Sequence, residues 1–124
     1  MLEILVIEDE LFLRQNIKTI LEMKGFVCHE ASHGAEGIEL LKTIMPDLIL
    51  CDVMMPGIDG FGVLEYVKSI ESFKNIPFIF LTARADTQDR ERAFEMNATD
   101  YITKPFSIIE LITSIEKGMI KPII

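Results

Sequence analysis

Five polar side chains in this sequence stand at or just after the ends of short apolar segments. They are three carboxylates, Glu8, Asp9 and Asp52, one hydroxyl, Thr82, and one ammonium, Lys104. Carboxylates that lie close together repel one another unless a cation offsets their charge. Mg²⁺ or Mn²⁺ takes oxygen ligands of this kind, and with Lys104 it could hold a phosphoryl group while Asp52 attacks phosphorus. These residue types therefore indicate phosphoryl transfer to an aspartate, if the fold brings them together.

The elements that must position these side chains follow from hydrophobic periodicity. Apolar runs predict strands at residues 3–7, 26–30, 48–51, 77–81 and 100–103. Segments with helical spacing predict helices at residues 10–24, 35–45, 61–71, 87–96 and 107–117. Strands this apolar can expose neither face, so they predict a parallel sheet covered by helices on both sides. Right-handed crossovers then favour an open, doubly wound, five-stranded α/β fold.

In such a sheet, ligands bind outside the carboxyl ends of the strands, where the strand order reverses. The first and third predicted strands lead into the acids, the fourth into Thr82 and the fifth into Lys104. We therefore expect all five side chains on one rim of the sheet. Glu10, which follows the first two acids, is interpreted as a helix-start charge favoured by the helix dipole rather than as a ligand.

Other local signals concern structure rather than chemistry. Ser107 and Glu110 have the spacing of a capping box, which predicts where the last helix starts. Its core-facing stripe is predicted to contain Phe106, Ile108, Leu111, Ile112 and Ile115. His29 and His33 are too few for a metal site and are expected to be solvated. Gly60 is interpreted as a turn residue at the opening of a helix.

Length and composition limit the function classes. The 124 residues suit one domain, which we place at residues 1–118 with residues 119–124 as a C-terminal tail. Twelve basic against twenty acidic residues give a net charge of −8, so direct nucleic-acid binding is not expected. No apolar run approaches the roughly 20 residues of a membrane span, and a basic signal-peptide start is missing, which predicts a cytoplasmic protein. Cys28 and Cys51 form no CxxC motif and are expected to be buried free thiols, and the lack of a His/Cys cluster disfavours zinc.

Four sequence blocks, in their order and with the helices between them, resemble the receiver domain of bacterial two-component response regulators. The blocks are ILVIEDE at residues 4–10, DLILCDVMMPGIDG at 47–60, FIFLTAR at 78–84 and DYITKPF at 100–106. The resemblance covers essentially the whole chain. It implies a flavodoxin-like (βα)5 fold with strand order 2-1-3-4-5.

The resemblance also implies roles for the acids. Asp52 matches the phosphoacceptor, and Glu8 and Asp9 match the acidic pair beside it. Asp9, Asp52 and the backbone carbonyl of Met54 match the ligands of the Mg²⁺ or Mn²⁺ ion.

Further roles implied by the resemblance fall on the fourth and fifth predicted strands. Thr82 matches the switch hydroxyl, Lys104 the phosphate-binding lysine, and Tyr101 the aromatic side chain that changes rotamer on activation. Pro105 matches a proline that follows a cis peptide bond, which would aim Lys104 inward. Asn97 stands where the family commonly has glycine, and because asparagine tolerates left-handed backbone, we expect the turn to be kept.

The function that the resemblance implies is a signalling switch rather than a turnover enzyme, although it would catalyse its own metal-dependent phosphorylation and dephosphorylation. A sensor histidine kinase or phosphotransfer protein would donate the phosphoryl group from a phosphohistidine. A downstream target protein or a fused output domain would contact the face formed by residues 87–96, 100–103 and 107–117. A homodimer could form through the same face.

Two other function classes stay open at this point. A pseudo-receiver would use the same fold as a constitutive interaction module without phosphorylation, and the complete set of rim residues argues against it. A phosphohydrolase with an aspartate nucleophile usually has a second acid two residues later, where this chain has Met54. The sequence contains neither a GxGxxG nor a GxxxxGK motif, which disfavours nucleotide binding.

Overall fold

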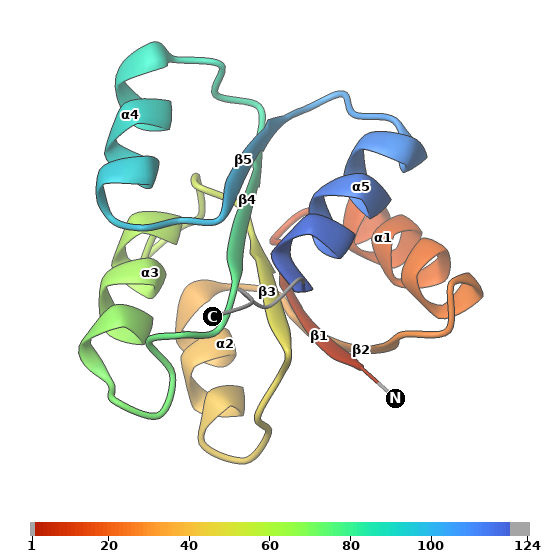
Figure 1. Cartoon of the computed structure of the whole chain (residues 1–124), viewed down its shortest axis with the longest axis horizontal. Helices are drawn as coiled ribbons and strands as arrows, with labels where there is room; N and C mark the ends of the chain where they lie inside the picture. Colours follow the sequence, from red (N-terminus) through yellow and green to blue (C-terminus); the bar gives the residue numbers. More distant parts are fainter. Residues whose placement is uncertain (1, 120–124) are drawn as a thin grey trace, which may run out of the picture.

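Five parallel strands form one open sheet between two layers of helices (Figure 1). The computed structural model describes residues 2–119. Along the chain the elements are β1 (Glu3–Ile7), α1 (Leu11–Met23), β2 (Val27–Ala31), α2 (Gly34–Leu41), β3 (Leu48–Cys51), α3 (Gly60–Ser69), β4 (Phe78–Thr82), α4 (Thr87–Glu95), β5 (Asp100–Thr103) and α5 (Ile108–Met119). The strand order is β2-β1-β3-β4-β5, and every neighbouring pair is parallel. The predicted doubly wound, flavodoxin-like α/β fold is confirmed.

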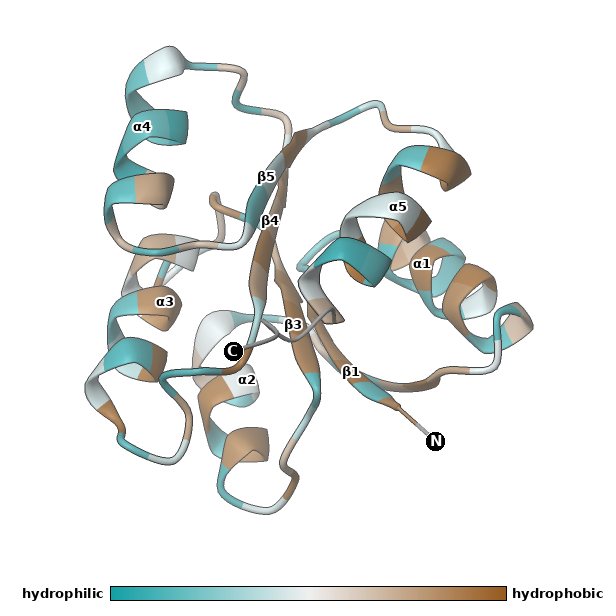
Figure 2. Cartoon of the chain, in the orientation of Figure 1, coloured by the Kyte–Doolittle hydropathy of each residue, from teal (hydrophilic) through white to brown (hydrophobic). Residues whose placement is uncertain are grey.

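Helices cover both faces of the sheet, as the apolar strands require. α1 and α5 lie on one face, and α2, α3 and α4 lie on the other (Figure 1). Residues of β3 alternate between the two cores: Leu48 and Leu50 pack with α1 and α5, whereas Ile49 and Cys51 pack on the opposite side. The central strands β3 and β4 are accordingly brown along most of their length in Figure 2. A slip of one residue would exchange the two faces of a strand, so the packing of particular side chains in each of the two cores fixes the register.

Most predicted boundaries lie within two residues of the observed ones, and α2 is the exception. It ends at Leu41 rather than at residue 45. The amides of Lys42 and Thr43 bond to carbonyls three residues earlier, and the Thr43 hydroxyl bonds to the Leu40 carbonyl. These bonds tighten and end the helix. Met45 therefore lies outside the helix and is 57% exposed.

Side-chain caps define where the helices beside the rim begin. Glu10 caps α1, because its carboxylate accepts hydrogen bonds from the amides of Phe12 and Leu13. This agrees with its interpretation as a helix-start residue. Before α5, Ser107 Oγ accepts from the Glu110 amide at 3.0 Å and Glu110 Oε1 accepts from the Ser107 amide at 3.2 Å. The predicted capping box is confirmed.

Some predicted environments are corrected by the structure. In the α5 stripe, Leu111 and Ile115 are fully buried, but Ile108 is 54% exposed, since the first turn of α5 lies at the outer edge of the molecule (Figure 1). Cys51 is buried as expected, whereas Cys28 is only half-buried, and both are free thiols.

His33 is exposed, as expected, whereas His29 is only half-buried, and both histidines make polar contacts. His29 Nε2 lies 2.7 Å from Glu3 Oε1 on the neighbouring strand β1. His33 caps α2, with Nδ1 accepting from the Glu36 amide at 3.2 Å. Both side chains therefore have structural partners that the sequence alone did not indicate.

The C-terminal boundary stays a prediction. α5 includes Met119, the first residue of the predicted tail, and residues 120–124 lie outside the described residues. Within residues 2–119, no helix combines the length and the apolar character that crossing a membrane requires. Asn97, before β5, has a φ of 65°, so the expected left-handed turn is present.

Gly60 has a packing role beyond that of a turn residue. It is the first residue of α3, and its amide donates to the Val53 carbonyl at 2.8 Å. A Cβ at this position would overlap the Asp52 carbonyl oxygen and would lie 2.8 Å from Val53 Cα and 2.9 Å from the Phe80 ring. Glycine is therefore what lets α3 start directly against the backbone of Asp52.

We expect Gly60→Ala to lower the free energy of unfolding by about 2 kcal/mol, because the backbone it would meet belongs to the end of a central strand. Gly62→Ala is the control in the same helix, since its Cβ would meet the Cγ2 methyl of the exposed Ile58 side chain at 2.9 Å instead of the backbone of a strand end. Alanine exceeds glycine in helix propensity by about 0.5–1 kcal/mol, so the control should be neutral or stabilising. Urea denaturation measures both, and equal effects of the two substitutions would contradict this role of Gly60.

Candidate functional site

The register of the sheet brings the polar strand ends to one rim. β1 and β3 pair along their last residues, so Glu8 and Asp52, which follow, leave the sheet side by side. β4 and β5 pair up to their ends, and the Lys104 amide donates to the Thr82 carbonyl at 2.8 Å. The structure therefore places these residues together, at the carboxyl edge that the sequence predicted.

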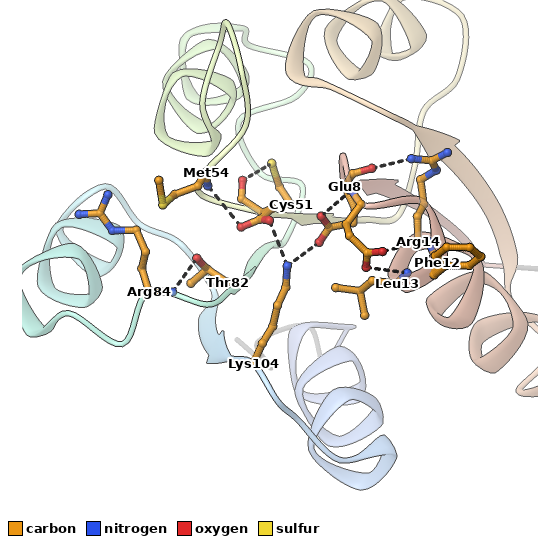
Figure 3. A network of polar contacts seen from close by, with 11 residues as sticks. Glu8, Phe12, Leu13, Arg14, Cys51, Met54, Thr82, Arg84 and Lys104 are labelled. Atoms are coloured by element: carbon orange, nitrogen blue, oxygen red, sulfur yellow. Dashed lines mark hydrogen bonds and ion pairs between the residues drawn. The ribbon is translucent and has the colours of Figure 1, made fainter.

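Lys104 links the ends of three strands (Figure 3). Its Nζ donates to Glu8 Oε1 at 2.7 Å and to Asp52 Oδ2 at 3.0 Å. The side chains of Lys104, Glu8 and Asp52 are 19%, 3% and 8% exposed. The peptide bond between Lys104 and Pro105 is cis, as the resemblance implied. One ammonium thus bridges two carboxylates that are almost completely removed from water, and it balances the charge of only one of them.

Burial and hydrogen bonds set the pKa values of Glu8 and Lys104. Desolvation raises the pKa of Glu8 from 4.5 to about 7, although hydrogen bonds from Lys104 and from the Glu10 amide act against the rise. Desolvation alone would lower the pKa of Lys104, but its hydrogen bonds to both carboxylates outweigh that effect and raise the pKa. Lys104 therefore keeps its charge near neutral pH. A further positive charge nearby would favour the ionised form of Glu8.

Three carboxylates at the rim lie close enough to share one cation. Oxygens of Glu8, Asp9 and Asp52 lie within 4.8 Å of one another, and Asp9 is the exposed member. The cluster offers oxygen donors, which fits Mg²⁺ or Mn²⁺ rather than zinc. Three carboxylates also exceed the charge of one ammonium, so a divalent cation would offset the excess.

The predicted backbone ligand lies beside this cluster. Met54 follows Asp52 by two residues, and its amide donates to Asp52 Oδ1 at 3.3 Å. Its backbone therefore stays close to the carboxylate. Ligation of a cation by the Met54 carbonyl remains a prediction.

Thr82 and Tyr101 are connected through the backbone of Arg84. Thr82 is fully buried, and its Oγ1 accepts from the Arg84 amide at 3.1 Å (Figure 3). The Tyr101 hydroxyl donates to the Arg84 carbonyl at 2.7 Å. Burial, followed by the nearby charge of Asp89, raises the pKa of this hydroxyl. A displacement of Thr82 would therefore reach Tyr101 through a single residue.

Arg14 also belongs to this site, although nothing in the sequence analysis indicated it. Its Nη1 donates to the Glu8 carbonyl at 2.8 Å, and its Nε donates to Glu30 Oε1 at 3.3 Å. The spacing of Arg14 and Lys18 on one side of α1 is a weak signal, because their shared partner Glu30 lies on β2. The pairing depends on the fold and has no local sequence pattern.

The chain is similar to known proteins along most of its length. A family model for the response regulator receiver domain matches residues 4–116. The chain belongs to this family. The "Non-phosphorylated HemR Receiver Domain" from Leptospira biflexa superposes with a TM-score of 0.90 at 32% identity, covering 100% of each chain.

Curated relatives carry this receiver domain within longer proteins. The chain is 41% identical over 116 residues to "Phosphate regulon transcriptional regulatory protein PhoB" of Escherichia coli K12, covering 94% of this chain and 51% of PhoB. It is 40% identical over 120 residues to "Sensor histidine kinase CheAY" of Helicobacter pylori, covering 95% of this chain and 15% of CheAY. The chain thus spans about half the length of PhoB and a smaller part of CheAY.

We expect Lys104→Met to lower the free energy of unfolding of the metal-free receiver domain by about 2–3 kcal/mol, because two buried carboxylates lose their shared cation. Lys42→Met is the matched control, since Lys42 pairs with Glu39 on the surface, where such a pair contributes about 0.5 kcal/mol or less. Urea denaturation with a chelator present measures the loss. Adding Asp52→Asn to Lys104→Met should recover part of it, and a loss no larger than that of the control would contradict the account.

Proposed function

We propose that the chain is a phosphorylation-controlled switch in which Asp52 accepts a phosphoryl group from a sensor histidine kinase or a phosphotransfer protein. The main support for the proposal is that the Lys104 ammonium bonds to the buried carboxylates of both Glu8 and Asp52 at the strand ends. Membership of the receiver family supports it, as does the similarity to a protein named as a sensor histidine kinase. Such a protein is a signalling switch rather than a turnover enzyme.

The proposed reaction uses the rim residues as follows. An Asp52 carboxylate oxygen attacks phosphorus, and the bond between phosphorus and the donor's imidazole nitrogen breaks, with its electron pair leaving on the imidazole. Lys104 has three N–H donors, so it can keep its bond to Glu8 while another N–H turns to a phosphoryl oxygen. Asp9, Asp52 and the Met54 carbonyl would hold Mg²⁺ or Mn²⁺, which when bound neutralises charge on the phosphoryl oxygens.

Thr82 and Tyr101 would convert phosphorylation into a conformational shift. In the structure the Thr82 oxygen accepts from the Arg84 amide, which leaves its own O–H free to donate to a phosphoryl oxygen. Tyr101 already lies inward and bonds to the Arg84 carbonyl, so phosphorylation would stabilise an existing arrangement rather than create it. Moving such an equilibrium from 1:99 to 99:1 takes about 5.5 kcal/mol, which charge-assisted hydrogen bonds to the phosphoryl group can largely supply.

For output we propose the face formed by α4, β5 and α5. Arg90 of α4 donates to the Tyr101 carbonyl of β5 at 2.9 Å, so α4 is attached directly to the strand that carries the switch residue. Phe94 on α4 and Ile109 on α5 are exposed on these two helices. A downstream target protein, a fused output domain or a second copy of the chain would cover them. The net charge of −8 supports a protein partner rather than direct nucleic-acid contact, and we keep the cytoplasmic location as part of the proposal.

Incubation with Mg²⁺ and a small acyl phosphate or phosphoramidate should add one phosphoryl group, detected by intact mass. Asp52→Asn should abolish the addition, because an amide oxygen is a poor nucleophile, and chelation should abolish it in the wild type. Asp47→Asn is the matched control, since Asp47 lies just before β3, at the opposite end of the strand, and it should be modified like the wild type.

Two outcomes would contradict the proposal. Modification of Asp52→Asn equal to that of the wild type would show that another group accepts phosphorus. Absence of any addition, together with partner binding unchanged by Asp52→Asn, would indicate the pseudo-receiver function instead.

Thr82→Ala should leave Asp52 phosphorylation measurable but remove its effect on β5, because the hydroxyl that joins the phosphoryl group to Arg84 is gone. The measurement is the change in the Tyr101 amide resonance on phosphorylation, expected to fall to less than about a third of the wild-type change if that hydrogen bond carries most of the coupling. Thr82→Ser keeps the hydroxyl and should retain the change. A full response in Thr82→Ala would disprove this route.

A further inference from the structure

We infer that Arg14 is a positioning residue that fixes the backbone from which Asp9 reaches the cation, an inference that rests on the proposed function. The Arg14 side chain is 14% exposed and lies beside Glu8 at the start of α1 (Figure 3). Its Nη1 donates to the Glu8 carbonyl at 2.8 Å and its Nε to Glu30 Oε1 at 3.3 Å. The guanidinium thus ties the segment after β1 to the neighbouring strand β2.

The bond to the Glu8 carbonyl acts on Asp9 because the two residues share a peptide group. That group is planar, so the direction of the Glu8 carbonyl also fixes the Asp9 nitrogen and constrains how the Asp9 side chain leaves the backbone. The preceding peptide group is held by the sheet, since the Glu8 amide donates to the Ala31 carbonyl at 3.0 Å. β2 ends at Ala31 and offers no partner to the peptide group between Glu8 and Asp9. Arg14 bonds to the carbonyl of that group instead.

Asp9 is the carboxylate of the cluster that needs this support. Glu8 and Asp52 are buried and both bond to Lys104. Asp9 is exposed, and among residues 2–119 no hydrogen bond or ion pair to its side chain is present. Its position relative to the other two carboxylates therefore depends on the backbone that carries it.

The charge of Arg14 and its positioning role act on cation binding in opposite directions. Repulsion between the guanidinium and a bound cation weakens binding, so removal of the charge alone would tighten it. Glu30 faces the guanidinium and reduces this repulsion, and Lys18 Nζ lies 3.4 Å from the same Glu30 carboxylate. Weaker cation binding after loss of Arg14 is therefore the signature of lost positioning.

The test is an Mg²⁺ titration of the isotope-labelled chain, followed by the amide resonances of Asp9 and Met54. Arg14→Met keeps the apolar stem and is expected to raise the Kd about tenfold, at the low end of the effect of residues that orient metal ligands. Lys18→Met is the matched control. It removes one positive charge from the same helix, and Lys18 pairs with the same Glu30 carboxylate as Arg14 but makes no hydrogen bond to Glu8. Its Kd should be unchanged or lower.

Two further readouts separate positioning from a general loss of structure. In the metal-free protein, the Asp9 amide should become more mobile on the picosecond-to-nanosecond timescale in Arg14→Met and not in Lys18→Met. Arg14→Lys keeps the charge and most of the stem, but one ammonium replaces a two-pronged donor, so its Kd should rise about threefold with little change in Tm. If Arg14→Met does not fold, the Kd of Arg14→Lys for Mg²⁺ provides the test.

The outcomes are distinguishable from those of the proposed function. If the wild type binds Mg²⁺ and the Arg14 variants bind it equally or more tightly, the positioning role is wrong while the switch proposal stands. If the wild type itself gives no response to Mg²⁺, both fail. A rise in Kd of equal size in Lys18→Met would also overturn the inference, because it would assign the effect to charge on α1.

Discussion

The burial of two carboxylates at the ends of adjacent strands is the constraint on which the rest of the site depends. The register of β1 and β3 places Glu8 and Asp52 side by side, and both residues are buried. Their counter-charge comes from β5, which is separated from β3 by β4. A side chain as long as lysine spans that gap, and its path crosses the end of β4, where Thr82 lies. The strand order therefore explains why a carboxylate pair, a hydroxyl and an ammonium meet at one place.

The surrounding packing keeps this arrangement stiff. Gly60 lets α3 start directly against the backbone of Asp52, so α3 packs against the end of β3. Glu10 and Arg14 tie the start of α1 to the segment after β1. Both supports act on backbone rather than on the reactive groups, which leaves the carboxylates available for a cation and a phosphoryl group. The site is thus preorganised by the fold, while Thr82 and Tyr101 connect it to a face where a partner can bind.

The sheet and most of the residues of its polar rim could be predicted from the sequence, because the end of each strand is indicated by neighbouring residues. Apolar runs followed at once by Glu8, Asp52, Thr82 and Lys104 identify both the sheet and its polar rim, and the capping box marks the start of α5. What could not be predicted depends on distances between elements. The bond from Arg14 to the Glu8 carbonyl, the close approach at Gly60 and the exposure of Ile108 appear only when α1, α3 and α5 are placed on the sheet. The early end of α2 has a different, local origin, since hydrogen bonds from Lys42 and Thr43 to carbonyls three residues earlier override a helical spacing that continues to Met45.

The chemical location of the phosphoryl group is the decisive measurement for this protein. Borohydride reduces an aspartyl phosphate to homoserine, so reduction after phosphorylation, followed by peptide mass spectrometry, identifies the residue that carried phosphorus. We predict homoserine at position 52, formed when Mg²⁺ is present and lost when it is chelated. Homoserine at position 9, or a phosphoryl group that resists borohydride on a histidine or serine, would contradict the role assigned to the buried carboxylate pair.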